Sequence, residues 1–350
     1  MTVVLLLLLA SPQGGVPTNA EEWYALGRAR VAAASKAYGQ LLATAPADSP
    51  YVEAVKADVL MRRLQYSRAI AGFRAALAQE PNLVSAKAAL AGMYRKLGRA
   101  EWADKEQAGI DALDCRTHRL ECDFVARRYE AVLAATAGGE SQGDLYWRGQ
   151  AGTGLADEAF HKLEELPPSP ELHKYRAGLD WEADRRLDVV KELREAVKLA
   201  PADREVRQEL ASALGAAGFY DEAYGIAREL LRGAPDSPQL NALAGDALLG
   251  SQKPEEAVPF LKRSLARAPG VPAVQASLGR AYMQLGEAEL ALPHLEAAAP
   301  IDADGSLHHL LATAYQRTGQ PKLAEEALAR YRELAARSTA TPPQLEITPP

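Results

Sequence analysis

Residues 218–235, GFYDEAYGIARELLRGAP, read as a glycine turn, a helix with a small residue early in it, and a proline that ends it. Similar sequence segments recur: QKPEEAVPFLKRSLARAP ends at Pro269, and GEAELALPHLEAAAP ends at Pro300. Glycine adopts positive φ without steric cost, and proline cannot continue a helix. The stretch therefore predicts one unit of a stacked helical array.

The repeat has a fixed internal spacing. An alanine lies five residues after each turn glycine, a large residue lies four before it, and a small residue lies seven before it. The small positions allow two helices to approach closely, and the large one fills the gap toward the next unit. The turn glycines are Gly98, Gly218, Gly286 and Gly319, and closing prolines stand at Pro81, Pro201, Pro235 and Pro269.

Composition agrees with helices built from alanine and leucine. Hydrophobic residues are 48%, charged residues 25% and aromatic residues only 6% of the 350-residue chain. Strands favour β-branched and aromatic residues, so this balance predicts an all-α protein. The net charge of -6 argues against a general nucleic-acid binder and against a polybasic membrane-surface protein.

This pattern resembles the tetratricopeptide repeat, a helix-turn-helix unit of 34 residues. The resemblance implies an all-α, right-handed superhelical solenoid. Repeats are expected over 50–117 and 170–338, as units at 50–83, 84–117, 170–203, 204–237, 238–271, 272–304 and 305–338. An opening helix or half repeat is expected at 20–49, and Gln252 replaces the turn glycine in one unit.

Residues 118–169 break the period. RLECDFVARRYEAVLAATA predicts one helix, and DLYWRGQAGTGLADEAFHKLEEL predicts a second. We interpret the region as one divergent, enlarged helical unit that continues the stacking. The alternative is a break between an N-terminal and a C-terminal array.

The two ends differ from the repeats. Val3 to Leu9 is an apolar run of the length of a signal-peptide core, although no lysine or arginine precedes it. We expect residues 1–19 to be a signal peptide and linker, and the protein to be exported, periplasmic or secreted. The alternative is a cytoplasmic protein whose apolar run is not a signal. Residues 339–350 are rich in proline and predict a flexible tail.

Motifs that would indicate catalysis lack their structural context. GESQG at 139–143 matches the nucleophile elbow, but a helix precedes Ser141 where a strand is needed. GQAGTG at 149–154 lacks the ending of a phosphate loop and is better explained by a neighbouring helix that approaches closely. We expect no enzyme activity, no cofactor and no metal.

The two cysteines, Cys115 and Cys122, lie close together in CRTHRLEC. On one continuous helix they would be about 10 Å apart, which is too far for a disulfide. A loop between them would bring them within range. Three alternatives stay open: a disulfide, two buried free thiols, or a metal site with His118.

The resemblance implies that the first helix of each unit lines a concave groove that holds a peptide. Mapping by register gives the candidate partner-binding residues Arg62, Arg95, Lys96, Lys174, Trp181, Arg280, Met283 and Arg317. The same face includes Asp58, Glu182, Ser212, Asp246, Gln284, His309, Thr313 and Gln316. The slight excess of basic residues favours an acidic or C-terminal peptide, and an ordinary solvated face is the alternative.

The sequence therefore predicts a non-enzymatic scaffold that binds a partner protein or peptide, in envelope assembly or regulation. It predicts no nucleic-acid partner and no integral membrane segment. The alternative is a non-catalytic subunit that presents substrates to a glycosyltransferase or a peptidase.

Overall fold

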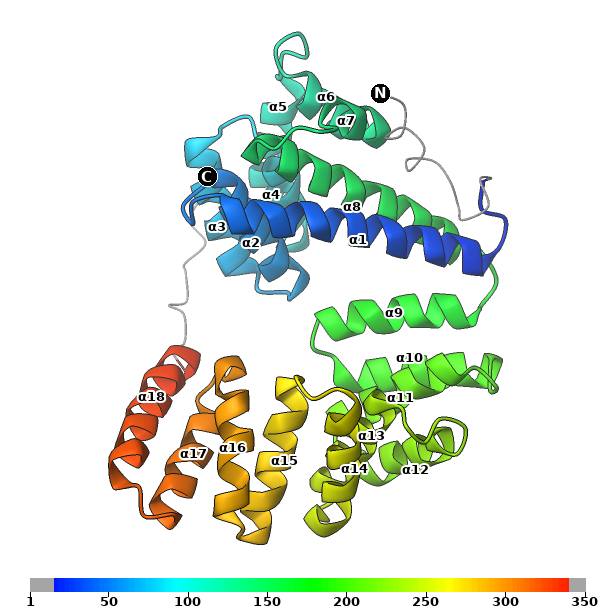
Figure 1. Cartoon of the computed structure of the whole chain (residues 1–350). Helices are drawn as coiled ribbons and strands as arrows, with labels where there is room; N and C mark the ends of the chain where they lie inside the picture. The colour runs from blue at the N-terminus through cyan, green and yellow to red at the C-terminus, as the bar shows by residue number, and fades with distance from the viewer. Residues whose placement is uncertain (1–15, 340–350) are drawn as a thin grey trace. The chain divides into compact units, whose positions relative to one another are not determined.

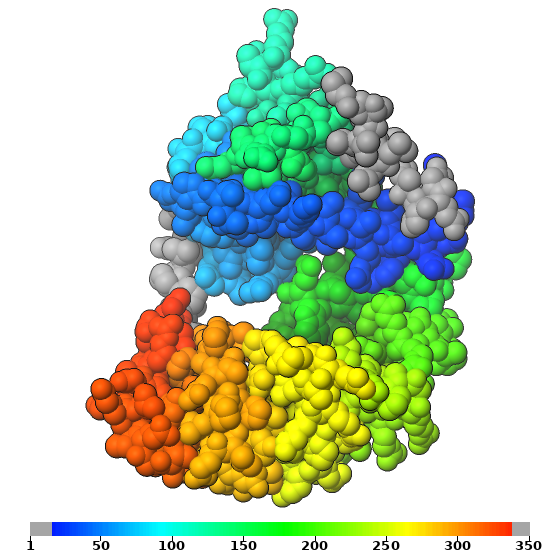
Figure 2. All heavy atoms as spheres, viewed as in Figure 1, coloured from blue at the N-terminus to red at the C-terminus, as the bar shows by residue number. Residues whose placement is uncertain are grey.

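The computed structural model describes residues 16–339, which divide into two compact units between Asp184 and Arg185 (Figures 1 and 2). Within the described residues all regular elements are helices, which confirms the all-α solenoid class. The apolar run at Val3 to Leu9 and residues 340–350 of the predicted tail lie outside the described residues. The boundary between the units falls inside the predicted repeat at 170–203.

Each unit is a series of helices joined by short connections. The first contains α1 (Ala20–Thr44), α2 (Pro50–Arg62), α3 (Tyr66–Gln79), α4 (Val84–Lys96), α5 (Ala100–Asp111), α6 (Arg119–Val125), α7 (Tyr129–Ala135), α8 (Gln142–Glu164) and α9 (Pro170–Glu182). The second contains α10 (Arg186–Leu199), α11 (Arg204–Ala216), α12 (Tyr220–Leu231), α13 (Pro238–Gly250), α14 (Pro254–Arg267), α15 (Pro272–Leu285), α16 (Ala288–Ala298), the 3-10 turn η1 (Ala299–Ile301), α17 (Ser306–Arg317) and α18 (Pro321–Thr339).

Each turn within a helix pair contains one residue in the left-handed backbone conformation. The four predicted turn glycines all have positive φ, between 71° and 86°. Non-glycine residues take the same conformation in the other pairs, with φ between 56° and 59° at Leu64, Arg127, Asp184 and Gln252. A side chain makes this conformation costly, so the turn geometry is imposed by the packing of the two helices.

The second unit stacks its helices in two layers. Each second helix (α12, α14, α16) contacts the first helix of its own pair and that of the next pair. The first helices also contact one another: α11 with α13, α13 with α15, and α15 with α17. We call these four first helices the inner layer. The small and large positions of the repeat are buried here, including Ala223, Ala257, Ala291 and Tyr282.

The first unit contains a helix pair that is distant in sequence. Helices α1 and α8 pack side by side and antiparallel, because Tyr38 lies against Gly149 and Ala34 against Gly152. A Cβ atom at Gly149 would lie 2.3 Å from the Tyr38 ring. The interpretation of GQAGTG as a place of close helix approach is therefore confirmed. The long opening helix has its partner inside the divergent region.

The prediction of a single helix over RLECDFVARRYEAVLAATA is wrong. The structure divides it into α6 and α7, with Arg127 in the left-handed turn between them. Asp123 explains the break, since its backbone carbonyl accepts from Arg128 N at 2.8 Å and its buried carboxylate accepts from the Arg128 guanidinium at 2.6 and 2.8 Å. These bonds close a tight turn in place of helical continuation.

A buried acceptor without a partner marks one repeat of the second unit. The side-chain oxygen of Asn241 is buried and unpaired, while its amide donates to two backbone carbonyls. In the following repeat the equivalent Gln275 accepts from His294 at 2.5 Å. The position equivalent to His294 is Phe260, which has no donor. Differences at both positions of the pair therefore leave the Asn241 oxygen unsatisfied.

Candidate functional site

The inner layer of the second unit carries one row of polar side chains. Ser212, Asp246, Arg280 and Thr313 occupy equivalent positions on α11, α13, α15 and α17, and each is exposed or half-buried. Their neighbours one position before, Ala211, Gly245, Gly279 and Ala312, are buried between helices. The helices therefore hold the row at a regular interval with the polar groups accessible.

Electrostatics link two members of this row. Desolvation raises the pKa of the Asp246 carboxyl, while a hydrogen bond from Ser277 and the charge of Arg280 lower it. Asp246 is nevertheless solvent-exposed. Ser277 was not among the residues predicted from the sequence, because it is buried and lies outside the register of the row.

The other predicted residues of the second unit lie beside the row. Met283 is half-buried and packs against the core of the unit, so it is in part a packing residue. Arg317 is exposed at the last residue of α17. The exposed Gln284 and Gln316 follow on α15 and α17. The inner layer thus offers hydrogen-bonding groups and two guanidinium groups beside one carboxylate.

In the first unit, Arg62, Lys174 and Trp181 lie on α2 and α9. The Arg62 guanidinium lies 3.5 Å from the carboxylate of Glu182, which joins the ends of these two helices. The Lys174 ammonium lies 5.5 Å from the centre of the Tyr24 ring on α1. Trp181 has 46% of its surface exposed, so its indole is half accessible.

Arg95 and Lys96 form the last turn of α4 and are both exposed. The Lys96 ammonium lies 6.0 Å from the Tyr66 ring of the preceding helix, whereas Arg95 extends to solvent. Cations at a helix C-terminus interact favourably with its dipole, which gives both residues a structural role as well.

Arg62 is surrounded by acidic groups. Desolvation lowers the pKa of Arg62, but Glu182, Asp58 and Asp157 raise it, and the pKa is raised overall. Desolvation raises the pKa of Asp58 to about 6, and Gln150 donates to this carboxylate at 2.9 Å. Desolvation likewise raises the pKa of Asp157. Arg62 therefore stays charged, and the acidic groups around it offset part of its positive charge on this face.

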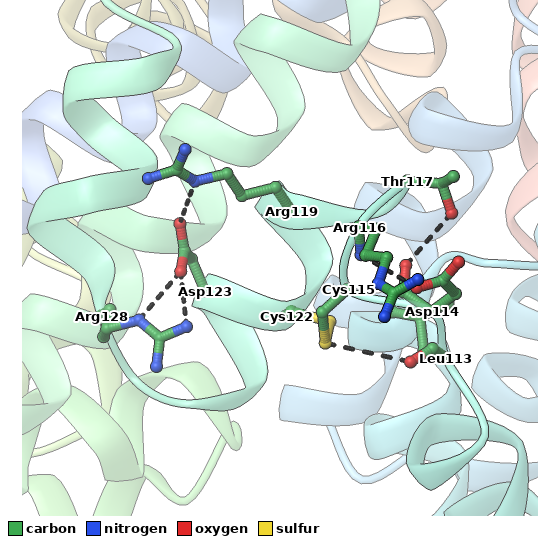
Figure 3. The surroundings of a disulfide bond; sticks show 9 residues. All are labelled: Leu113, Asp114, Cys115, Arg116, Thr117, Arg119, Cys122, Asp123 and Arg128. Carbon is green, nitrogen blue, oxygen red and sulfur yellow. Dashed lines mark hydrogen bonds and ion pairs between the residues drawn. A yellow bond between two sulfur atoms is a disulfide. The ribbon is translucent and has the colours of Figure 1, made fainter.

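The structure joins Cys115 and Cys122 by a disulfide, with Cα atoms 5.6 Å apart. Cys115 lies in the connection between α5 and α6, and Cys122 lies on α6 (Figure 3). Among the described residues 16–339, no group of three or more histidine, cysteine or acidic residues is arranged to hold a metal.

Ser141 has a structural role at the start of α8. Its hydroxyl oxygen accepts from Asp144 N at 3.1 Å, and the carboxylate of Asp144 accepts from Ser141 N at 3.3 Å. This reciprocal capping box satisfies backbone donors that a helix N-terminus leaves free. The G-x-S-x-G match is therefore explained by helix capping.

Comparison with known proteins identifies the repeat. A family model described as tetratricopeptide repeat matches residues 248–312. Among solved structures, MamA 41-end from Desulfovibrio magneticus RS-1 is 22% identical, covers 49% of this chain and 97% of that one, and has a TM-score of 0.42. TTC0263, a thermophilic TPR protein in Thermus thermophilus, is 20% identical, covers 48% and 92% respectively, and has a TM-score of 0.41. No curated protein matches the sequence. In residues 16–339, no helix is both long and apolar enough to cross a membrane.

Proposed function

We propose that this chain, in which residues 248–312 match a tetratricopeptide repeat model, is a non-enzymatic scaffold. It would bind a segment of a partner protein on the inner layer of its second unit. The row of Ser212, Asp246, Arg280 and Thr313 carries this proposal. Four equivalent helices present accessible polar groups at a regular interval, with buried small residues beside them. An extended partner segment would find one hydrogen-bonding group per repeat along this layer.

The electrostatic part of the proposal concerns Arg280 and Arg317. Both guanidinium groups are exposed on first helices, and Arg280 is only partly balanced by Asp246. This arrangement favours a partner segment with a carboxylate, in the form of an acidic side chain or a C-terminus. Arginine binds carboxylates through two parallel hydrogen bonds, which adds specificity to charge attraction.

The proposed location is outside the cytoplasm, in envelope assembly or regulation. The disulfide between Cys115 and Cys122 supports this proposal, because disulfides persist in oxidising compartments and are rare in the cytosol. The apolar run at Val3 to Leu9 supports it from the sequence. Fractionation of cells that express the complete chain, followed by mass determination, would test both export and removal of the N-terminal segment.

A pair of matched variants tests the binding face. Arg280→Glu with Arg317→Glu reverses two charges on the inner layer, and Arg228→Glu with Arg263→Glu reverses two exposed charges on the second helices α12 and α14. Each variant is used to recover cross-linked partners from envelopes, after circular dichroism has shown equal helix content. We expect partner recovery to fall at least tenfold for the inner-layer variant alone.

Equal recovery by the two variants would refute the inner layer as the binding face. The identity of the recovered protein separates the two functions considered above. Recovery of a glycosyltransferase or a peptidase would favour the role of a substrate-presenting subunit, whereas a non-catalytic partner would favour an assembly scaffold.

A further inference from the structure

The bonded cysteine pair lies at the surface of the first unit. Cys115 is exposed in the connection that follows α5, and Cys122 is half-buried at the middle of α6 (Figure 3). The connection folds on itself, since the backbone carbonyl of Asp114 accepts from Thr117 N at 3.2 Å and from His118 N at 3.0 Å. The bond therefore closes a small loop whose outer sulfur belongs to an accessible residue.

The sequence around the sulfurs carries charges of both signs: Arg116, Arg119 and Glu121 lie between the cysteines, and Asp114 and Asp123 flank them. Between the two cysteines the chain reads RTHRLE, with Arg116 directly after Cys115. The Arg119 guanidinium is directed toward Asp123, at 3.8 Å, and Arg116 is the cation closest in sequence to the exposed residue Cys115 (Figure 3). A neighbouring cation stabilises thiolates, and a more stable thiolate is a better leaving group in exchange with an external thiol.

Helix α6 depends on few restraints. It has seven residues, which is well below the length at which an isolated helix is stable. It contacts α4 and α7, through the half-buried Leu120 and Phe124 among others, and the Phe124 ring lies 5.3 Å from that of Trp147 on α8. A contact of 3.2 Å between His118 and Asn82 links its start to the connection between α3 and α4. The disulfide adds a covalent restraint to this start.

We propose that the Cys115–Cys122 disulfide is a site of thiol–disulfide exchange with a protein dithiol, and that its opening loosens α6 and the connection before it. The reductant's first thiolate attacks the Cys115 sulfur, forms a mixed disulfide with it, and expels Cys122 as a thiolate. The reductant's second thiolate then attacks its own first sulfur and expels Cys115 as a thiolate. Two electrons pass to this chain, both cysteines take up protons, and the reductant becomes a disulfide.

Opening the bond leaves the rest of the unit in place. The core of the first unit is formed by α1 to α5, α7 and α8, with Phe73, Tyr94 and Tyr146 fully buried. Neither cysteine is part of that core. The exchange therefore changes the order of residues 112–125 and not the fold, and it is independent of the inner layer of the second unit.

Reduction of the complete native protein by dithiothreitol tests the exchange. The fraction of free thiols is followed by alkylation and mass spectrometry, next to the rate of global unfolding measured separately. We expect reduction at least about a hundredfold faster than global unfolding, which for stable domains is slow. Reduction no faster than unfolding would overturn the proposal, because the bond would then react only in the unfolded chain.

Two variants separate the effect of Arg116 from general surface charge. Arg116→Gln should slow native reduction about threefold, because the negative charge that is shared among the reacting sulfurs around Cys115 loses a neighbouring cation. Arg63→Gln removes an equally exposed arginine at the end of α2 and should leave the rate unchanged. Equal rates in the two variants would contradict the role given to Arg116.

Hydrogen exchange tests the conformational consequence. In the reduced protein the protection factors of the amides of 119–125 should fall at least about tenfold, while those of the α8 amides stay unchanged. The Cys115→Ser, Cys122→Ser double variant should show the same pattern without any reductant. Unchanged protection of α6 in both samples would show that opening the bond has no structural effect and would overturn the proposed switch.

Discussion

Gln252→Gly should stabilise the second unit, because Gln252 is, among the described residues of that unit, the one non-glycine residue in a left-handed turn between two helices. Its φ is 58°, whereas the equivalent Gly218 and Gly286 have φ of 86° and 82°. A side chain in this conformation costs about 1–2 kcal/mol. The Gln252 side chain is exposed, and its backbone N–H keeps its bond to Leu249 at 3.0 Å after substitution.

The free energy of unfolding should rise by about 1 kcal/mol. This net gain is smaller than the relieved strain, because the larger entropy of the unfolded chain with glycine costs roughly 0.5–1 kcal/mol. For a unit of this size, that gain should move the urea midpoint by about 0.5 M. The reverse change, Gly286→Gln, should lower the midpoint by a similar amount. Gln252→Ala serves as a control and should give no gain, because alanine keeps the Cβ atom.

The unfolding of the two compact units can be followed separately. All four tryptophans, Trp23, Trp102, Trp147 and Trp181, lie in the first unit. Tryptophan fluorescence therefore reports on that unit, and circular dichroism at 222 nm reports on both. Gln252→Gly should shift the dichroism transition and leave the fluorescence transition unchanged. A neutral or destabilising effect, or an equal effect of Gln252→Ala, would refute the reasoning.

Three further changes test other parts of the structure. Gly149→Ala places a methyl group against the Tyr38 ring and should destabilise the first unit by about 1–2 kcal/mol, read from the fluorescence midpoint. In the folded protein the pKa of Asp58 is about 6, above its ordinary value. The contribution of Asp58 to stability is therefore present below the unfolded pKa and is lost as the pH rises through 6. Asp58→Asn should flatten the dependence of the unfolding free energy on pH between pH 4 and 6. Asn241→Gln with Phe260→His copies the bonded pair of the next repeat and should show a favourable coupling of about 1 kcal/mol in a double-mutant cycle; a coupling of zero would show that the bond does not form.

The turns illustrate how far the sequence predicts this fold. Gly98, Gly218, Gly286 and Gly319 were identifiable because glycine is the residue that a left-handed turn favours. Arg127 takes the same conformation without that signal, so the break between α6 and α7 was missed. Local propensity favoured one continuous helix there, and the bonds between Asp123 and Arg128 overrode it.

The periodicity of the sequence could not predict the pairing of α1 with α8. A repeat indicates contacts between neighbours in sequence, whereas Ala34 and Gly152 meet across a long stretch of chain. The same limit applies to the candidate site. Register placed Arg62 on the first helix of its repeat, but its acidic surroundings come from α8 and α9 as well as from its own helix. The net charge of a helix face could therefore be assigned only from the tertiary structure.

Site-specific photo-cross-linking tests the central claim, that the inner layer of the second unit is the partner-binding face. A photoreactive residue is placed at Gln284 or Gln316 on the inner layer, or at the exposed Glu256 on the second helix α14. Irradiation of living cells should join the same partner to the chain from Gln284 and from Gln316, and not from Glu256. Cross-linking of that partner from Glu256 alone, or equally from all three positions, would contradict the account.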